Sequence, residues 1–335
     1  MTDQNAAPPL ATQLGKVLTA QPGDVTRPLS TRTRLSYSLR IRRFEFLPLT
    51  VTVPLVPALL AARSWRELVS VDVLVAALVI ILSIQVGNIA NCLADREMDA
   101  TYKTRLSEAV YGLGVPNVVR QIVVTSGLCA LLEIFLTFRT HHVDLLVIGL
   151  LWAVLGIGYS LPPLHLNGRG IWQLPTLLNV YFILPGLFML RAFDGPVEWA
   201  AVVALCGFSL TNIGIIVINH AEDLPEDERF SIRTYVRALG PTNSLFLGTG
   251  MLVIGAMLVV GSAYSMIGVS WGCLLYLAVW APGLRFIWQT ALAVRGKPID
   301  LAVATLRARS KRAPLHTCLI GWATVALAAS VFLTR

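Results

Sequence analysis

The stretch Gly87-Asn88-Ile89-Ala90-Asn91-Cys92-Leu93-Ala94-Asp95-Arg96-Glu97-Met98-Asp99 closes a long apolar run. Asn91, Asp95 and Asp99 recur at every fourth residue, so a helix through this stretch would place their side chains along one face. Carboxylate and amide oxygens are the ligands that Mg²⁺ takes in proteins, commonly together with phosphate oxygens of a substrate. We therefore interpret the three residues as a candidate magnesium site at the end of an apolar helix.

The same pattern returns later in the chain, again after an apolar run. It reads Asn219-His220-Ala221-Glu222-Asp223-Leu224-Pro225-Glu226-Asp227, and Asn219, Asp223 and Asp227 have the spacing of the first motif. Each motif leads through a basic segment to a Leu-Gly pair, which indicates a duplicated membrane unit. Two such rows could hold a metal-bound diphosphate between them.

The composition indicates an integral membrane protein. Of the 335 residues, 55% are hydrophobic and only 14% are charged, whereas soluble domains carry about 25% charged residues. The net charge of +8 comes from basic residues between apolar runs, where the positive-inside rule explains them better than binding to nucleic acid does. The five cysteines are scattered and lack the spacing of a disulfide framework or a zinc site.

Nine apolar runs have roughly the ~20 residues that a membrane-spanning helix needs. Lys and Arg gather in the N-terminal tail and in the loops after the even-numbered runs, which predicts a cytoplasmic N-terminus and puts both acidic motifs at the cytoplasmic mouth. We expect an all-α integral membrane fold of nine helices around a central cavity, with a cytoplasmic cap formed by the loops after helices 2 and 6. The runs are residues 44–62, 70–92, 117–137, 143–162, 173–192, 197–219, 243–262, 266–288 and 315–333.

The chain divides into a tail and a membrane domain. Residues 1–35 are polar and lack the apolar segment of a secretory signal peptide, so we expect a disordered cytoplasmic tail. An organelle transit peptide is the alternative, because acidic residues are few in this segment. Residues 36–335 are expected to form the membrane domain, in a bacterial cytoplasmic membrane or an organelle membrane.

The two motifs together resemble those of the UbiA-type intramembrane prenyltransferases, which have an Asn/Asp-rich motif after helix 2 and a second Asp-rich motif after helix 6. The stretch Gly158-Tyr159-Ser160-Leu161-Pro162-Pro163-Leu164-His165-Leu166 resembles the Tyr-Ser-x-Pro-Pro segment after helix 4 in some branches of that family. Ile232-Arg233-Thr234 through Leu239-Gly240 resembles the segment after its second motif. The resemblance covers roughly residues 35–335.

The resemblance implies an enzyme that uses Mg²⁺ to ionise an isoprenoid diphosphate and transfers the prenyl chain to an aromatic or other electron-rich acceptor. An apolar chamber would keep water from the carbocation-like chain, and the prenyl tail would stay in a lipid-facing tunnel. The implied partners are the isoprenoid diphosphate, a hydrophobic acceptor and the lipid bilayer. Nothing in the sequence indicates nucleic acid or a protein partner.

The resemblance also implies roles for individual residues. The catalytic residues would be the four carboxylates Asp95, Asp99, Asp223 and Asp227, and these would hold the metal together with Asn91 and Asn219. A single arginine can instead be a topology determinant, and an aromatic residue near a helix end can be an interfacial anchor. The further candidates for binding substrate are Arg43, Lys103, Arg105, Tyr159, Ser160 and Arg233, besides the two asparagines.

Two departures from the family pattern affect these expectations. Pro225 predicts a fresh helix start with Asp223 at the N-cap, so Asp227 need not share a face with Asn219. The segment from Tyr102 to Ser107 keeps Arg105 but lacks the Arg-Pro pair of many aromatic prenyltransferases.

Two alternatives to prenyl transfer follow from the same residues. The altered segment after the first motif suggests a terpene cyclase on the same scaffold, in which double bonds of the prenyl chain itself trap the cation. An ion-coupled transporter is less consistent, because transporter sites lie near the bilayer midplane and these acidic residues cluster at one mouth.

Overall fold

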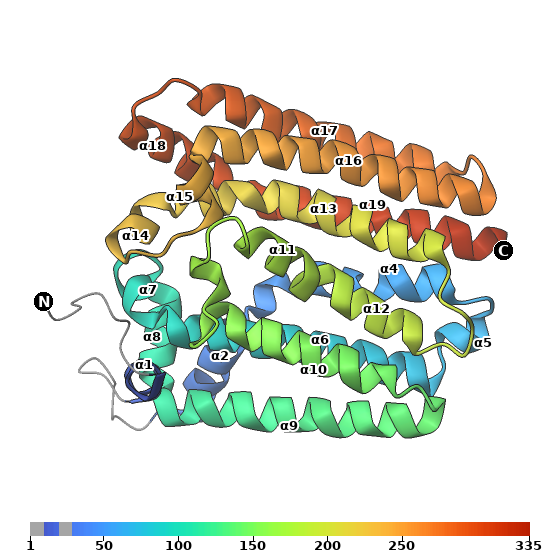
Figure 1. Ribbon diagram of the computed structural model, residues 1–335, viewed down its shortest axis with the longest axis horizontal. Coiled ribbons are helices and arrows are strands. Elements are labelled where there is room, and N and C mark those ends of the chain that lie inside the picture. Colours follow the sequence, from blue (N-terminus) through green and yellow to red (C-terminus); the bar gives the residue numbers. More distant parts are fainter. Residues whose placement is uncertain (1–9, 20–28) are drawn as a thin grey trace, which may run out of the picture.

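Long helices lie side by side in the protein, and helix α1 (Leu10–Leu18) and the C-terminus lie at opposite ends of the bundle (Figure 1). The computed structural model describes residues 10–19 and 29–335. Within these residues the secondary structure is helical, apart from turns and one isolated bridge between Gly170 and Thr234. The all-α prediction is therefore confirmed for the described part of the chain.

Eight helical segments among the described residues are long and apolar enough to cross a membrane. Six of them are single helices, while the first and the fourth are each divided into three shorter helices. The segments are Phe44–Ala61 (η1 Phe44–Phe46, α3 Leu47–Thr50 and α4 Thr52–Ala61), α6 (Val71–Ala94), α9 (Val115–Thr140), Gln173–Arg191 (α11 Gln173–Leu178, η3 Asn179–Ile183 and α12 Leu184–Arg191), α13 (Trp199–Glu222), α16 (Pro241–Ile267), α17 (Trp271–Val294) and α19 (Ala313–Thr334).

The fourth predicted run is shorter than the others. It forms α10 (Asp144–Ser160), an apolar helix of 17 residues. The helix stops at Ser160 because Pro162 and Pro163 follow, and a residue before proline is disfavoured in the helical conformation. The run of 143–162 that hydropathy suggested thus includes residues that lie beyond the helix.

Prolines lie within both divided segments, as the sequence suggested. Pro57 lies inside α4, and Pro185 follows a π-helical turn formed by Asn179–Ile183. A proline removes a backbone donor and its ring clashes with the preceding turn, so the backbone must bend or rewind there. Single π turns occur frequently at functional sites in helical proteins.

Short helices follow α6 and α13 at one end of the bundle, on the left in Figure 1. Those after α6 are α7 (Arg96–Tyr102) and α8 (Thr104–Leu113). Those after α13 are α14 (Leu224–Arg229) and α15 (Tyr235–Leu239). The segments that follow the two acidic motifs are therefore helical, and they lie at the same end of the molecule.

Part of the segment expected to be disordered is instead helical. Residues Leu10–Leu18 form α1, and α2 covers Thr31–Ile41. The buried guanidinium of Arg96 holds the end of α1 by donating to the carbonyl oxygens of Val17, Lys16 and Thr19 at 2.8–3.2 Å. These are carbonyls that a helix C-terminus leaves without intrahelical partners. The rest of the expected tail, 1–9 and 20–28, lies outside the described residues.

Helix α13 carries the second motif and packs closely on α16. A Cβ atom built on Gly207 would lie 2.6 Å from the carbonyl oxygen of Gly255, and one on Gly214 would lie 2.7 Å from that of Gly248. Small residues at such crossings allow helix backbones in a membrane to approach closely. This close packing fixes the position of the second motif relative to the bundle.

Candidate active site

A cavity of about 340 Å³ joins the two acidic motifs. Asn91 and Asp95 line it from the end of α6, and Asn219, Asp223 and Asp227 line it from the end of α13 and from α14. Five of the six predicted metal ligands thus face one space, although the two motifs lie far apart in the sequence.

The first motif does not continue as one straight helix. Helix α6 ends at Ala94, and Asp95 separates it from α7. The side chain of Asp99 is only 3% exposed, and it does not line the cavity. Asn91 Nδ2 donates to Asp95 Oδ2 at 2.6 Å and to Ser160 Oγ at 3.2 Å. Ser160 therefore orients Asn91 and does not itself line the cavity.

The second motif breaks at its middle aspartate, as Pro225 predicts. Asp223 separates α13 from α14, which has a proline in its first turn. Asp227 nevertheless lines the same cavity as Asn219 and Asp223. Thr234 Oγ1 donates to Asp227 Oδ2 at 2.8 Å, which holds the carboxylate in place.

Only some of the predicted basic residues reach the cavity. Lys103 and Arg43 line it, and Lys103 Nζ lies 2.8 Å from Asp223 Oδ2, so the ammonium links the two motifs. Arg105 and Arg233 are absent from the lining. Arg43 has a left-handed backbone conformation with φ of 51°, which is strained for a residue with a side chain.

A polar network that the sequence analysis missed supports Tyr159. Gln173 Nε2 donates to the Tyr159 hydroxyl at 2.8 Å, and Gln173 Oε1 accepts from the backbone N–H of Tyr235 at 3.1 Å. Gln173 thereby connects α10, α11 and α15. In the sequence, Gln173 is a polar residue at the start of an apolar run. This position could have indicated its role, because polar side chains within membrane segments are usually functional or structural contacts.

Other lining residues also escaped the sequence analysis. Tyr181 lies in the π turn, and Asn167 precedes α11. Neither belongs to a spaced pattern, so nothing in the sequence separated them from ordinary tyrosine and asparagine residues.

The electrostatics of the cavity fit a bound cation. Burial raises the pKa of Asp95 to about 7 and that of Asp227 to about 7, and it raises the pKa of Asp99 to about 6. Buried carboxylates whose pKa rises in this way favour a compensating positive charge nearby.

The side chains of the cavity offer oxygen atoms as metal ligands, but they do not surround an ion completely. The amide oxygen Asn219 Oδ1 is buried and has no hydrogen-bond partner among the described residues. Among all the residues that the structure describes, no three His, Cys, Asp or Glu side chains come close enough together to hold one ion. Mg²⁺ commonly binds one or two carboxylates and completes its shell with water and substrate phosphates, so this arrangement fits Mg²⁺ when it is bound with a diphosphate.

The chain belongs to the UbiA prenyltransferase family, whose family model matches residues 48–310. Homogentisate solanesyltransferase, chloroplastic, from Arabidopsis thaliana is 31% identical over 137 residues. That match covers 38% of this chain and 35% of the relative, so it spans about a third of the length of the curated relative.

Solved structures show the same fold. A structure of digeranylgeranylglyceryl phosphate synthase has a TM-score of 0.58 at 17% identity, with 88% of this chain and 99% of that chain covered. A UbiA homolog from Archaeoglobus fulgidus bound to GPP and Mg²⁺ has a TM-score of 0.58 at 13% identity, with 86% and 99% covered. At these identities the likeness concerns the fold alone.

Proposed function

We propose that this protein is a Mg²⁺-dependent intramembrane prenyltransferase that ionises an isoprenoid diphosphate and transfers the prenyl chain to an electron-rich hydrophobic acceptor. The observation that carries the proposal is that both acidic motifs line one cavity in a chain of the UbiA family. The A. fulgidus homolog bound to GPP and Mg²⁺ supports it.

The proposed topology has nine spanning helices around the cavity. We count α10 as the ninth, since 17 residues lie at the lower end of the range that crosses a bilayer. The helices after α6 and α13 would form the cap, and the concentration of Lys and Arg supports a cytoplasmic mouth.

The acidic motifs would hold the metal-bound diphosphate between them. Asn91 and Asp95 would contribute one group of ligands, and Asn219, Asp223 and Asp227 the other. When bound, Mg²⁺ neutralises the charge that builds on the departing diphosphate. Lys103 is positioned to exchange its contact with Asp223 for a phosphate oxygen, and Arg43 would face the same group.

Aromatic side chains of the cavity would protect the allylic cation. Phe46, Tyr159, Tyr181 and Phe182 all line the cavity beside the motifs. Aromatic faces attract cations, and an apolar surround keeps out the water that would otherwise capture the cation. The acceptor would then form the new bond to the allylic carbon and release a proton.

Product analysis with purified full-length protein tests the proposal. Geranyl, farnesyl and geranylgeranyl diphosphates are incubated with and without Mg²⁺ and a panel of aromatic acceptors, and the products are identified by mass spectrometry. We expect prenylated acceptor and diphosphate release only when Mg²⁺ is present. A cyclised terpene formed without acceptor would indicate a cyclase, and full turnover of Asp223→Ala would contradict the assigned site.

A further inference from the structure

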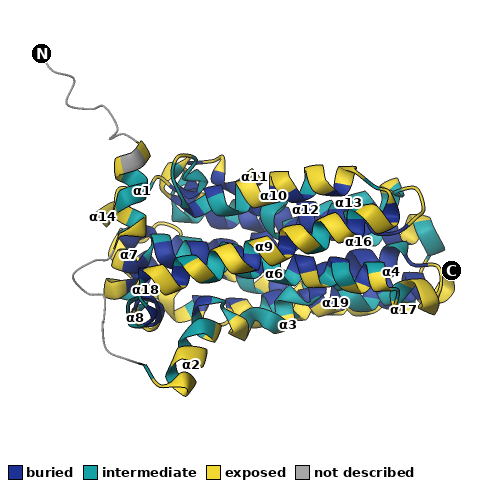
Figure 2. Cartoon of the chain, turned by 90° about the horizontal axis from the view of Figure 1, so that it is seen from below, coloured by how far each residue is buried: buried dark blue, intermediate teal, exposed yellow. Residues whose placement is uncertain are grey.

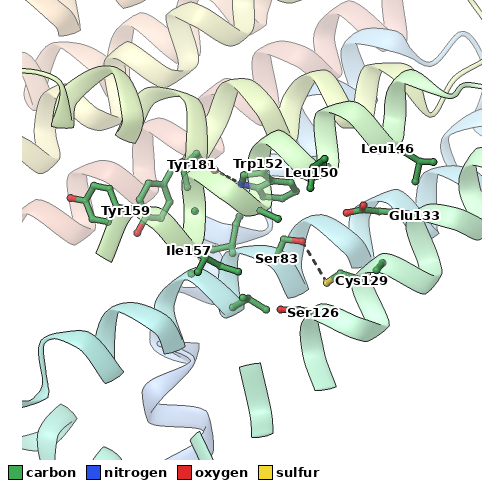
Figure 3. Close-up of a pocket in the computed structure, with 18 of the residues that line it drawn as sticks. Ser83, Ser126, Cys129, Glu133, Leu146, Leu150, Trp152, Ile157, Tyr159 and Tyr181 are labelled. Carbon is green, nitrogen blue, oxygen red and sulfur yellow. Dashed lines mark hydrogen bonds between the residues drawn. The ribbon is translucent and has the colours of Figure 1, made fainter. Parts of the chain in front are cut away.

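A second chamber of about 380 Å³ adjoins the site cavity (Figure 3). It lies among α6, α9, α10 and the π turn, and it shares Ile84, Asn91, Tyr159 and Tyr181 with the site cavity. The two spaces therefore meet at the first acidic motif. Figure 3 shows Tyr159 and Tyr181 at one end of the chamber and Glu133 toward the other.

Small residues and a rigid aromatic side chain shape the chamber. Gly87, Gly149 and Gly156 line it from α6 and α10. A Cβ atom on Gly87 would meet nothing within 4 Å, so this glycine faces open space. Trp152 is buried, and its indole N–H donates to the carbonyl oxygen of Val180 at 2.8 Å, which fixes that wall.

One wall of the chamber carries polar groups that lack partners. Ser126, Cys129 and Glu133 line it at helical spacing along α9. Ser126 Oγ is buried, and neither it nor the Glu133 carboxylate forms a hydrogen bond or ion pair with the described residues. By helix geometry, Ser126 and Glu133 are about 10 Å apart along the axis.

These polar groups determine which substrate fits the chamber. A hydrocarbon tail offers no hydrogen bond, so seating it here would bury a hydroxyl and a carboxylate without partners, which is unfavourable. A ligand with hydroxyl donors at two separated positions would satisfy both groups. A negatively charged ligand would be repelled by Glu133.

The chamber also has a route to the bilayer. Ile134, Leu146 and Leu150 line it and are 43%, 37% and 67% exposed. They lie on the neighbouring helices α9 and α10, within the apolar surface that faces outward; Figure 2 shows exposed residues along α9. A lipophilic molecule can therefore enter between these two helices without crossing the acidic mouth.

We propose that this chamber binds the prenyl acceptor, and that the acceptor is an elongated, uncharged aromatic molecule with hydroxyl donors at two ends. The inference rests on the proposed prenyl transfer. Ser126 and Glu133 accept hydrogen bonds from the acceptor, and the end of the acceptor near Tyr159 and Asn91 lies beside the diphosphate cavity.

The test measures equilibrium binding to purified full-length protein. One probe is dihydroxystilbene, a two-ring phenol with a hydroxyl at each end, and the other is its dimethyl ether, which is nearly the same length but has no hydroxyl donor. We expect saturable binding of the phenol and about tenfold weaker binding of the ether, because the ether cannot donate to Ser126 or Glu133. Equal affinity for the two probes, or no saturable binding of the phenol, would overturn the proposal.

Variants of two glycines locate the bound phenol. Gly87→Leu fills the chamber, and Gly87→Ala fills it partly in case the larger residue impairs folding. Gly127→Leu is the matched control, because Gly127 lies on α9, is exposed and does not line the chamber. We expect phenol affinity to fall at least tenfold in Gly87→Leu, to fall less in Gly87→Ala, and to remain unchanged in Gly127→Leu. Unchanged affinity in both Gly87 variants would place the phenol elsewhere.

Binding of geranyl and geranylgeranyl diphosphates with Mg²⁺ separates this inference from the proposed function. We expect both affinities to be unchanged in the Gly87 variants. A loss confined to geranylgeranyl diphosphate would make the chamber the tail site and overturn the inference. If the unmodified protein bound neither diphosphate, the proposed function would fail, while the phenol result would still report on the chamber.

Discussion

The two acidic motifs have the same spacing, yet their side chains are arranged differently. Both break at the middle aspartate, at Asp95 and at Asp223. In the second motif all three side chains line the cavity, whereas in the first Asp99 is buried outside it. A repeated sequence pattern thus produces two unequal halves of one site, because each helix break turns the third residue in a different direction.

The contacts that each motif makes with distant helices also differ. Arg96 of the first motif is buried and holds the end of α1. Glu226 of the second motif accepts from Arg307 Nη2 at 2.7 Å, and Arg307 lies on α18 (Ile299–Ser310). The first motif is therefore anchored by the N-terminal segment, and the second by a helix near the C-terminus.

The largest expected difference is between the third residues of the two motifs. Asp227→Asn removes a carboxylate that faces the cavity, and we expect kcat/KM for prenyl transfer to fall by about 100-fold or more. Asp99→Asn should lower kcat/KM by only about tenfold, because Asp99 acts on the site through the charges of Lys103 and Arg43. Steady-state kinetics at saturating Mg²⁺ measure both. Equal losses would mean that the motifs are functionally equivalent.

Lys103 links the two halves, so its removal should weaken diphosphate binding. We expect Lys103→Gln to raise the KM for geranylgeranyl diphosphate by at least about tenfold, since a hydrogen bond to a charged group contributes about 1.5–3 kcal/mol. Arg105→Gln is the matched control outside the cavity lining and should change KM by less than about threefold. The reverse ranking would reassign the phosphate contact to Arg105.

The side chains that support each motif should have smaller effects. Thr234→Val removes a hydroxyl that donates to the Asp227 carboxylate, and Ser160→Ala removes a hydroxyl that accepts from the neutral Asn91 amide. Loss of such supporting contacts typically costs about 10- to 100-fold in metal affinity. We expect the larger loss for Thr234→Val, because hydrogen bonds to a charged acceptor are the stronger ones. Calorimetric titration with Mg²⁺ and a non-hydrolysable diphosphate measures both variants.

The smallest effect on catalysis should come from Arg96→Gln. This change leaves several carbonyl oxygens around α1 without their donor, so we expect the thermal midpoint to fall by about 2 °C per kcal/mol lost. The value of kcat should change by less than about threefold, because the guanidinium does not line the cavity. Arg34→Gln, at an exposed position of α2, is the control. A large loss of kcat would show that the anchor also positions Asp95.

Local patterns predicted much of this molecule. Hydropathy located eight of the spanning segments, because each must be apolar over a bilayer thickness regardless of its neighbours. Pro225 predicted the helix start at Asp223, since proline acts on the adjacent turn. The same local reasoning overestimated the length of α10 and left α1 unrecognised, because a nine-residue helix depends on a distant contact through Arg96.

The sequence by itself determined the membrane class of the protein, the two acidic rows and their place at helix ends, because these follow from composition and from the spacing of near neighbours. Only the tertiary structure decided that Lys103 reaches Asp223 while Arg105 stays outside the cavity, and that Gln173 supports Tyr159. It also created the chamber that contains Glu133. These features depend on where the helices break and on how distant segments pack together, because the breaks and the packing determine the direction in which each side chain points.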